Sequence, residues 1–226
     1  MVRAVIFDMF ETLVTHFDSM PYFCREIAAD MGVEERAIRD TWDGTDHDRT
    51  IGRLTLEEVI ARILRENGRC DDALFQRIVE KRRQSKVEVF RHLHPEILPM
   101  LEALKRRGVK IGLVSNCFSE ERGPIRESAL FPFFDAAMLS CEQGICKPDE
   151  EIFLRCAAAL DVPCAACLYV GDGGSRELEV AGKLGMRPLQ VAWYLRDEPR
   201  QPTRRMAGYV HLEAPMELLS YLENDF

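Results

Sequence analysis

Short apolar segments recur along the chain and, from about residue 90 onward, alternate with helical patterns. An apolar run of this length is typical of a strand that is covered on both faces of a parallel sheet. Such segments lie near residues 2–7, 109–114, 137–140, 167–170, 188–193 and 208–211. Because helices separate the later strands, the pattern predicts an α/β fold with a doubly wound parallel sheet.

Between residues 16 and 88 the apolar positions follow a helical period, and no convincing strand is present. Thr55 begins a capping box that opens one helix, and Asp71 can cap the next helix. We therefore predict that residues 1–15 and 89–226 form the α/β core domain. Residues 16–88 are expected to form an all-helical cap domain, inserted after the first strand.

The composition narrows the possible partners and the location. The 226 residues include 30 Lys and Arg against 38 Asp and Glu, and a net charge of −8 argues against non-specific binding to nucleic acid. No apolar run approaches the roughly 20 residues that span a bilayer, and the first residues do not resemble a signal peptide. We therefore expect a cytoplasmic protein without a membrane partner, and the sequence leaves monomer and homodimer open.

Four short apolar runs each end in a residue that can handle a charged group. VRAVIF is followed by Asp8, and VKIGLV, QGIC and ACLYVG lead to Ser115, Lys147 and Asp172. Because parallel strands collect their C-terminal ends at one edge of a sheet, we expect these side chains to meet. Two carboxylates, a hydroxyl and an ammonium are the groups needed to bind an oxyanion together with a metal ion. Lys147 is unfavourable for the dipole of the helix that it precedes, so a functional site explains it better than stability does.

The segments that carry these residues resemble the haloacid dehalogenase (HAD) superfamily of hydrolases, in the subfamily I group with a helical C1-type cap. The matching segments are FDMFETL (7–13), LVSN (113–116), KPDEEIF (147–153), VGDGGSRELEVAGKLGM (170–186) and, in the cap, GRLTLEEV (52–59). Each motif alone is weak, but their order and their places at strand ends are specific. The resemblance implies a Rossmann-like core and a hydrolase that acts through a covalent aspartyl intermediate.

The resemblance also implies a role for each matching residue. Asp8 would be the nucleophile, and Lys147 would neutralise charge on the transferred group. Ser115 and the backbone N–H of Asn116 would hold that group. The implied metal ligands of a Mg²⁺ cofactor are Asp8, the backbone carbonyl of Phe10, Asp172 and, directly or through water, Glu177.

The chain departs from the phosphatases of this superfamily just after the nucleophile. Those proteins have an aspartate two residues further on, which protonates the leaving oxygen and then activates water. Here that position is Phe10, and the next residue, usually Gly, is Glu11. Loss of a general acid–base reduces the rate by about 10²–10⁴-fold.

Three interpretations follow. The chain could be a Mg²⁺-dependent phosphohydrolase that is slow, prefers good leaving groups, or uses Glu11 or His16 as a substitute base. It could be a dehalogenase, because those relatives have an aromatic residue at this position and a halide leaves without a proton. They work without a metal, however, so the acidic pair Asp172 and Glu177 favours the phosphohydrolase. It could also be a catalytically weak or inactive binding protein, in which the aromatic run 130–135 is either a partner surface or core packing.

The substrate is expected to be a small anionic molecule, most simply a phosphate ester, bound partly by the cap. Arg49 and Arg53 could hold a second anionic group or could simply be exposed on a charged loop. Trp42 could belong to the core of the cap or to the wall of the pocket. The polar stretch 196–205 is interpreted as a surface loop. The sequence does not identify the substrate.

Overall fold

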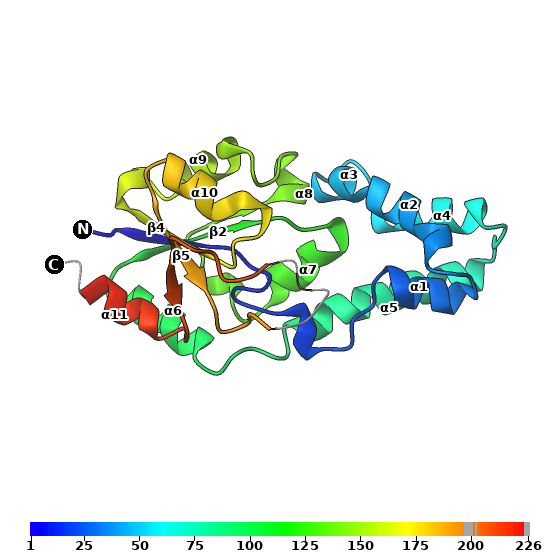
Figure 1. Ribbon diagram of the computed structural model, residues 1–226, viewed down its shortest axis with the longest axis horizontal. Coiled ribbons are helices and arrows are strands. Elements are labelled where there is room, and N and C mark those ends of the chain that lie inside the picture. Colours follow the sequence, from blue (N-terminus) through cyan, green and yellow to red (C-terminus); the bar gives the residue numbers. More distant parts are fainter. Residues whose placement is uncertain (197–200, 202, 224–226) are drawn as a thin grey trace.

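The computed structural model describes residues 1–196, 201 and 203–223, and its centre is a six-stranded sheet in which all paired strands are parallel. The strand order is β3-β2-β1-β4-β5-β6 (Figure 1). The strands are β1 (Ala4–Phe7), β2 (Lys110–Ser115), β3 (Ala136–Leu139), β4 (Cys167–Gly171), β5 (Arg187–Val191) and β6 (Val210–Leu212). Each predicted strand is present, so the predicted α/β fold with a doubly wound parallel sheet is confirmed.

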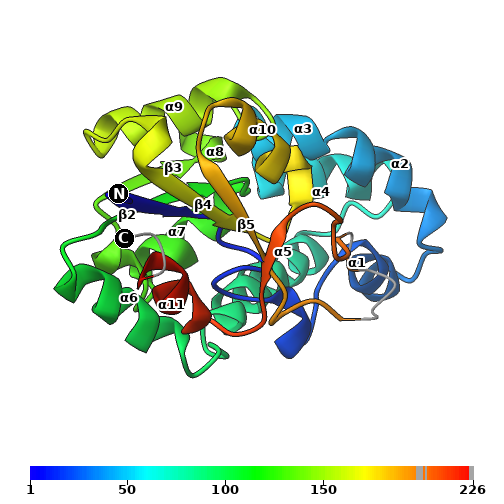
Figure 2. The ribbon, with the colours of Figure 1, turned by 60° about the vertical axis from the view of Figure 1, so that its left-hand side comes forward.

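Helices cover both faces of the sheet, which explains why its strands are apolar along their length. One face packs against α6 (Ile97–Arg106), α7 (Ser119–Glu127) and α11 (Glu217–Glu223), and the other against α9 (Glu150–Ala159) and α10 (Glu177–Lys183) (Figures 1 and 2). All residues of β1 are fully buried. Val5 and Phe7 belong to the first hydrophobic cluster, whereas Ala4 and Ile6 belong to the second. This alternation follows from the period of two in a strand.

Five further helices gather at one end of the molecule, and we call them the helical lobe (Figure 1). They are α1 (Cys24–Met31), α2 (Arg36–Gly44), α3 (Asp46–Thr50), α4 (Leu56–Glu66) and α5 (Asp72–Val89). They surround a hydrophobic cluster of their own, which includes Ile27, Ile60 and Ile78. The predicted capping box at Thr55 and the cap at Asp71 are both confirmed. Within the described residues, no helix is long and apolar enough to cross a membrane.

The helical lobe contacts the α/β core along two elements, α7 and the short helix α8 (Ser140–Gln143). The hydroxyl of Ser140 donates a hydrogen bond to the carbonyl of Thr50 (2.7 Å). Gly52 packs so closely on the core that a Cβ would collide with the carbonyl oxygen of Cys141, and its φ of +74° also favours glycine. These contacts fix the end of α3 above the C-terminal edge of the sheet.

The aromatic run at 130–135 is core packing rather than an exposed partner surface. Leu130 is fully buried. The hydrophobic cluster between the sheet and α6 packs against the rings of Phe131, Phe133 and Phe134.

The interpretation of 196–205 as a surface loop is wrong for two of its residues, while 197–200 and 202 lie outside the described residues. Gln201 and Thr203 are both buried. Gln201 donates a hydrogen bond to the carbonyl of Tyr194 (3.0 Å) and accepts one from the backbone of Arg196 (2.7 Å). Hydrogen bonding satisfies these polar groups inside the protein, so their polarity did not require exposure.

Candidate active site

The strand order reverses between β1 and β4, and the charged residues gather at the C-terminal edge beside this reversal. Asp8 follows β1, and its backbone N–H donates to the carbonyl of Val170 in β4 (2.9 Å). Asp172 follows β4, and Ser115 is the last residue of β2. Lys147 lies between α8 and α9, and its Nζ is 2.7 Å from Oδ1 of Asp8. Residues far apart in sequence therefore meet as predicted.

Glu177, the first residue of α10, is fully buried and forms a second ion pair with Lys147. The hydroxyl of Tyr169 donates to its Oε2 (2.9 Å), and the backbone N–H of Gly173 donates to its Oε1 (3.1 Å). Gly171 provides the space for this carboxylate, because a Cβ there would collide with Oε1. The side chain of Glu177 is therefore held in one position by neighbours on three sides.

Asp172 is oriented by hydrogen bonds to both carboxylate oxygens. Thr203 donates to Oδ2 (2.7 Å), and the backbone N–H of Gly174 donates to Oδ1 (2.9 Å). Gln190 of β5 donates to the backbone carbonyl of Asp172 (2.7 Å). No motif in the sequence points to Thr203, which belongs to a polar, proline-containing stretch.

Burial dominates the acid–base properties of this cluster. Burial and the nearby charge of Glu177 raise the pKa of Asp8 to about 7. Burial and the charge of Asp8 raise the pKa of Asp172 to about 6, and burial also raises the pKa of Glu177. Burial alone would lower the pKa of Lys147, but Asp8 and Glu177 raise it, so Lys147 carries a proton at neutral pH.

The three carboxylates form a donor set that suits a small, hard cation. One oxygen from each of Asp8, Asp172 and Glu177 can be chosen so that all three atoms lie within 4.8 Å of one another. Lys147 is the one ammonium paired with this cluster among the described residues, so negative charge is in excess when all three acids are ionised. Carboxylate oxygens at an open strand edge are typical Mg²⁺ ligands. The residues therefore fit a divalent cation.

Asn116 connects the end of β2 to the segment that carries Lys147. Its Oδ1 accepts a hydrogen bond from the backbone N–H of Lys147 (2.8 Å), and its Nδ2 donates to the carbonyl of Lys147 (3.0 Å) and to the hydroxyl of Ser175 (3.2 Å). Ser115, which is fully buried, donates to the carbonyl of Asn116 (3.4 Å). The side chain of Asn116 thus positions Lys147, a function that the sequence did not indicate.

Comparison with known proteins identifies the family of the chain. Residues 2–185 match the family of haloacid dehalogenase-like hydrolases. The chain belongs to this family. Glyceraldehyde 3-phosphate phosphatase from Methanopyrus kandleri is 26% identical over 206 residues, which cover 84% of each chain.

Solved structures that share the fold of this HAD-like hydrolase include the two that follow. The 2-haloacid dehalogenase from Pseudomonas syringae pv. tomato is 22% identical and covers 100% of both chains, with a TM-score of 0.69. A magnesium complex of a HAD family enzyme from Bacteroides thetaiotaomicron is 17% identical, with a TM-score of 0.63, and the match covers 84% of this chain and 92% of that one.

In this HAD-like hydrolase, the turn after β1 differs from the phosphatase pattern in a defined way. The ring of Phe10 lies 4.6 Å from the ring of His16, measured between centroids. Glu11 has a φ of +57°, and its carboxylate accepts hydrogen bonds from the hydroxyl of Thr15 (2.6 Å) and the backbone N–H of His16 (2.9 Å). Glu11 therefore stabilises its own turn, which accounts for a carboxylate at a position where the family usually has Gly.

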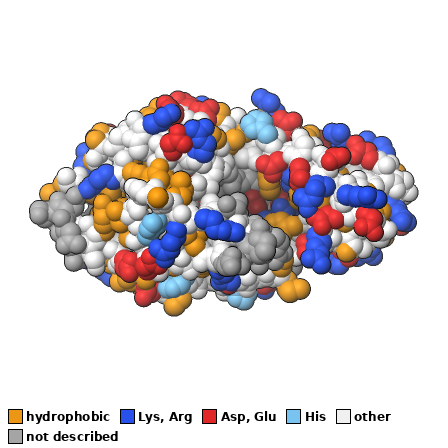
Figure 3. All heavy atoms as spheres, in the orientation of Figure 1, with side chains coloured by type: hydrophobic (Ala, Val, Ile, Leu, Met, Phe, Trp, Pro, Cys, Tyr) orange, Lys and Arg blue, Asp and Glu red, His pale blue; other side chains and the backbone are white. Residues whose placement is uncertain are grey.

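Two neighbouring cavities, of about 360 and 490 Å³, lie between the helical lobe and the HAD-like core. Asp46, Thr50, Asn116 and Ser175 border both of them. In the space-filling view the surface is hollowed where the lobe meets the core (Figure 3). The larger cavity reaches Lys147, and the smaller one reaches Phe10, so both adjoin the candidate active site.

The arginines that the sequence singled out differ in burial. Arg49 is 1% exposed, and its guanidinium lies 4.2 Å from the ring centre of Trp42 and 4.3 Å from that of Phe118. The alternative of an exposed Arg49 is therefore wrong. Arg53 is exposed, pairs with Asp48 (3.5 Å) and borders the larger cavity. Trp42 belongs to the lobe's hydrophobic cluster and also borders the smaller cavity.

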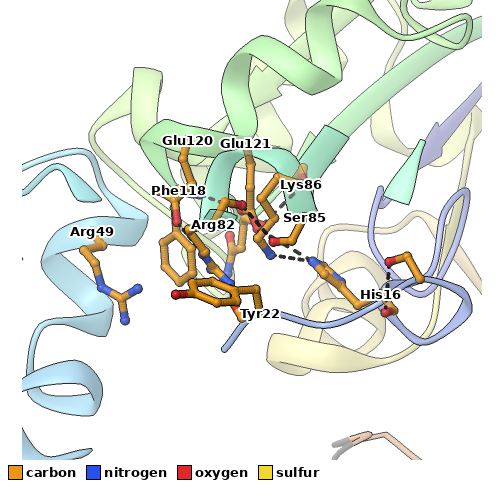
Figure 4. A network of polar contacts seen from close by, with 12 residues as sticks. His16, Tyr22, Arg49, Arg82, Ser85, Lys86, Phe118, Glu120 and Glu121 are labelled. Carbon is orange, nitrogen blue, oxygen red and sulfur yellow. Dashed lines mark hydrogen bonds and ion pairs between the residues drawn. The ribbon is translucent and has the colours of Figure 1, made fainter. Parts of the chain in front are cut away.

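A buried network joins α5 of the lobe to α7 of the core (Figure 4). Arg82 pairs with Glu120 (3.1 Å), and Lys86 pairs with Glu121 (2.6 Å). Nζ of Lys86 also lies 2.8 Å from Nε2 of His16. These residues could not be identified from the sequence, because two cations four positions apart on a helix more often mark a solvated face.

Proposed function

We propose that this HAD-like hydrolase is a Mg²⁺-dependent phosphohydrolase that acts on a small phosphorylated metabolite through an aspartyl intermediate. The observation that carries the proposal is the buried cluster of three carboxylates, Asp8, Asp172 and Glu177, in which Asp8 and Glu177 pair with the ammonium of Lys147. Such a cluster suits a metal-bound oxyanion and has no evident structural purpose. We further propose that residues 1–15 and 89–226 form the core domain and that residues 16–88 form a C1-type cap domain.

The proposed roles follow from the positions of the side chains. Asp8 is the nucleophile, and the contact from Lys147 to its Oδ1 orients the carboxylate. Ser115 and the backbone N–H of Asn116 hold the transferred phosphoryl group at the end of β2. Lys147 also offsets the negative charge that phosphate brings into the buried site.

The metal would be held by Asp8, the carbonyl of Phe10 and Asp172, with Glu177 supporting it directly or through water. When bound, Mg²⁺ supplies positive charge that counteracts the repulsion between an anionic nucleophile and an anionic ester. The hydrogen bonds from Thr203 and Gly174 keep both oxygens of Asp172 in fixed positions for this role. Outer-shell contacts of this kind are typical of functional metal sites.

The decisive experiment measures hydrolysis of 4-nitrophenyl phosphate with Mg²⁺ and with a chelator. We expect Mg²⁺-dependent release of nitrophenol, which Asp8→Asn abolishes without lowering the thermal unfolding temperature. Asp8→Asn removes the nucleophile but keeps the size of the side chain, so the loss of activity would not be explained by a loss of folding. Equal activity in the Asp8→Asn variant would exclude the aspartyl intermediate.

Phe10 favours dehalogenation as a second candidate function, because a halide leaves without a proton. Chloride release from 2-chloropropionate in the absence of a metal would support it. The buried carboxylates of Asp172 and Glu177 argue against it, because without a cation they repel the charge of Asp8. If neither substrate is turned over but beryllofluoride binds in a Mg²⁺-dependent way, the protein is a binding protein that retains the fold.

A further inference from the structure

The smaller cavity has a wall of aromatic rings that come from separate parts of the chain. Phe10 lies in the turn after β1, Phe23 precedes α1, Trp42 belongs to α2, and Phe118 precedes α7. Its volume of about 360 Å³ lies within the range of pockets for small molecules. Because Asn116 and Ser175 also border this space, a group bound there lies next to the predicted phosphate position.

Both of the Lys and Arg side chains that line this cavity are paired with carboxylates. Arg82 pairs with Glu120, and Lys86 pairs with Glu121, and all four side chains are buried. Their positive charges are therefore used to hold the lobe against the core, rather than left for a second anionic group of a substrate. A third buried cation, Arg49, lies over the rings of Trp42 and Phe118 but is not part of the lining of the cavity. The rings therefore form most of the apolar lining, and rings favour a flat, apolar partner.

The chemistry at Phe10 limits the leaving group independently of the cavity. An alkyl phosphate releases an alkoxide, which is strongly basic and needs a proton from the enzyme as it departs. A phenol is ionised near pH 10, as the tyrosine side chain is, so a phenolate departs far more easily than an alkoxide. Phe10, which stands where the phosphatases have their general acid, is also one of the rings that line the cavity.

We propose that the substrate class of this enzyme is the aryl phosphate monoester, with the aryl ring held by Phe10, Phe23, Trp42 and Phe118. This inference rests on the proposed phosphohydrolase function. A carboxylate oxygen of Asp8 forms a bond to phosphorus while the bond from phosphorus to the aryl oxygen breaks, and the electron pair leaves on the phenolate. Water then attacks phosphorus, which releases inorganic phosphate and restores the Asp8 carboxylate. The proton that water loses passes to the phenolate or to the solvent.

Three phosphorylated test substrates distinguish the effect of ring binding from the effect of the leaving group. Phenyl phosphate has both features, acetyl phosphate has a leaving group that needs no proton but no ring, and glycerol 3-phosphate has neither. With Mg²⁺ present, we expect kcat/KM for phenyl phosphate to exceed that for glycerol 3-phosphate by at least about 100-fold. Acetyl phosphate should approach the kcat of phenyl phosphate but show a KM roughly tenfold higher, because it makes no ring contact.

Variants test the contribution of the rings directly. Phe118→Leu and Phe23→Leu keep an apolar side chain but remove the ring, and each should raise the KM for phenyl phosphate about threefold to tenfold more than the KM for acetyl phosphate. Phe131→Leu is the matched control, because this ring packs on the core and borders neither cavity.

The outcomes distinguish this inference from the function on which it rests. Turnover of glycerol 3-phosphate as fast as phenyl phosphate, or an equal rise in KM for acetyl phosphate in both ring variants, would overturn the aryl substrate while the phosphohydrolase stands. Absence of Mg²⁺-dependent turnover of all three phosphates would reject the phosphohydrolase, and the aryl substrate with it.

Discussion

The ring of Phe10 occupies the turn after β1, with the ring of His16 at 4.6 Å and that of Phe90 at 6.5 Å. The sequence identifies this residue as a departure from the phosphatase pattern because its position is counted from Asp8. It does not show that the ring borders a cavity, because the other walls, including Phe23 and Phe118, come from distant elements. Contacts of this kind depend on how the lobe sits on the core.

Restoring the missing acid tests the importance of this residue. We expect Phe10→Asp to raise kcat/KM for glycerol 3-phosphate by at least about tenfold, because the new carboxyl group can protonate the alkoxide as it leaves. Phe10→Asn is the control, since its amide has a similar size but cannot act as this acid. Steady-state assays with Mg²⁺ measure the difference, and equal rates for the two variants would contradict the explanation.

Glu11 illustrates how a candidate catalytic group becomes a structural one when its contacts are known. Its carboxylate is engaged by Thr15 and His16, and its backbone has a left-handed conformation. We expect Glu11→Ala to lower the free energy of unfolding by about 2 kcal/mol through loss of the buried hydrogen bonds. Glu11→Gly should lower it by about 1 kcal/mol less, because glycine adopts a positive φ without strain. Urea unfolding measures both values, and a larger loss for Glu11→Gly would contradict the role of backbone strain.

At the scale of elements, the packing of α5 against α7 is what the sequence predicted least well. The apolar period identifies which helices exist and which of their faces are buried, but not which helix lies opposite. Arg82 and Lys86 are buried only because Glu120 and Glu121 face them from another part of the chain. By contrast, the strands were predictable, since burial on both faces leaves an apolar run that needs no knowledge of the partner.

Neutralising one carboxylate of the buried network between α5 and α7 should lower the stability of the protein. We expect Glu121→Gln to lower the free energy of unfolding at neutral pH by about 3–5 kcal/mol, because it leaves the ammonium of Lys86 buried without a counter-charge. Glu142→Gln is the matched control, since its pair with Arg126 is partly exposed and should contribute at most about 1 kcal/mol. Denaturant unfolding gives both values. Similar losses of unfolding free energy in the two variants would show that the buried pair stabilises the protein no more than the exposed pair does.

The same substitution should change the response to acid. Burial alone would raise the pKa of Glu121, but Lys86 and His16 hold it well below its usual range. A carboxylate with a lowered pKa in the folded state stabilises the protein above its unfolded pKa and loses that contribution as the pH falls. The wild-type protein should therefore lose more stability than Glu121→Gln between about pH 5 and pH 3.

At the scale of the whole molecule, the candidate site depends on strand order. Asp8, Ser115 and Asp172 were predicted to meet because parallel strands place their C-terminal ends together, and the structure does bring these ends to one edge. Thr203 and Tyr169 could not be predicted in the same way. Tyr169 lies inside an apolar strand like any core residue, and Thr203 is connected to Asp172 only through the folded chain.

The charge balance of the assembled site predicts how Mg²⁺ and pH act together. Burial and the charge of Glu177 raise the pKa of Asp8 to about 7 in the metal-free protein, and burial and the charge of Asp8 raise the pKa of Asp172 to about 6. A raised carboxyl pKa means that the folded state holds protons more tightly than the unfolded state, so stability without metal should fall as the pH rises from about 4 to 7. Mg²⁺ must displace these protons, so it competes poorly in acid and well in base.

We therefore expect about 10 mM Mg²⁺ to raise the unfolding temperature more at about pH 8 than at about pH 5.5. Differential scanning fluorimetry at both pH values, with and without the metal, measures this difference. Asp172→Asn removes one ligand and one of the repelling charges, so it should stabilise the metal-free protein at about pH 8 and reduce its response to Mg²⁺. Since a protein without a metal site would gain the same small amount at both pH values, an equal response would remove the physical basis for placing a cation between Asp8 and Asp172.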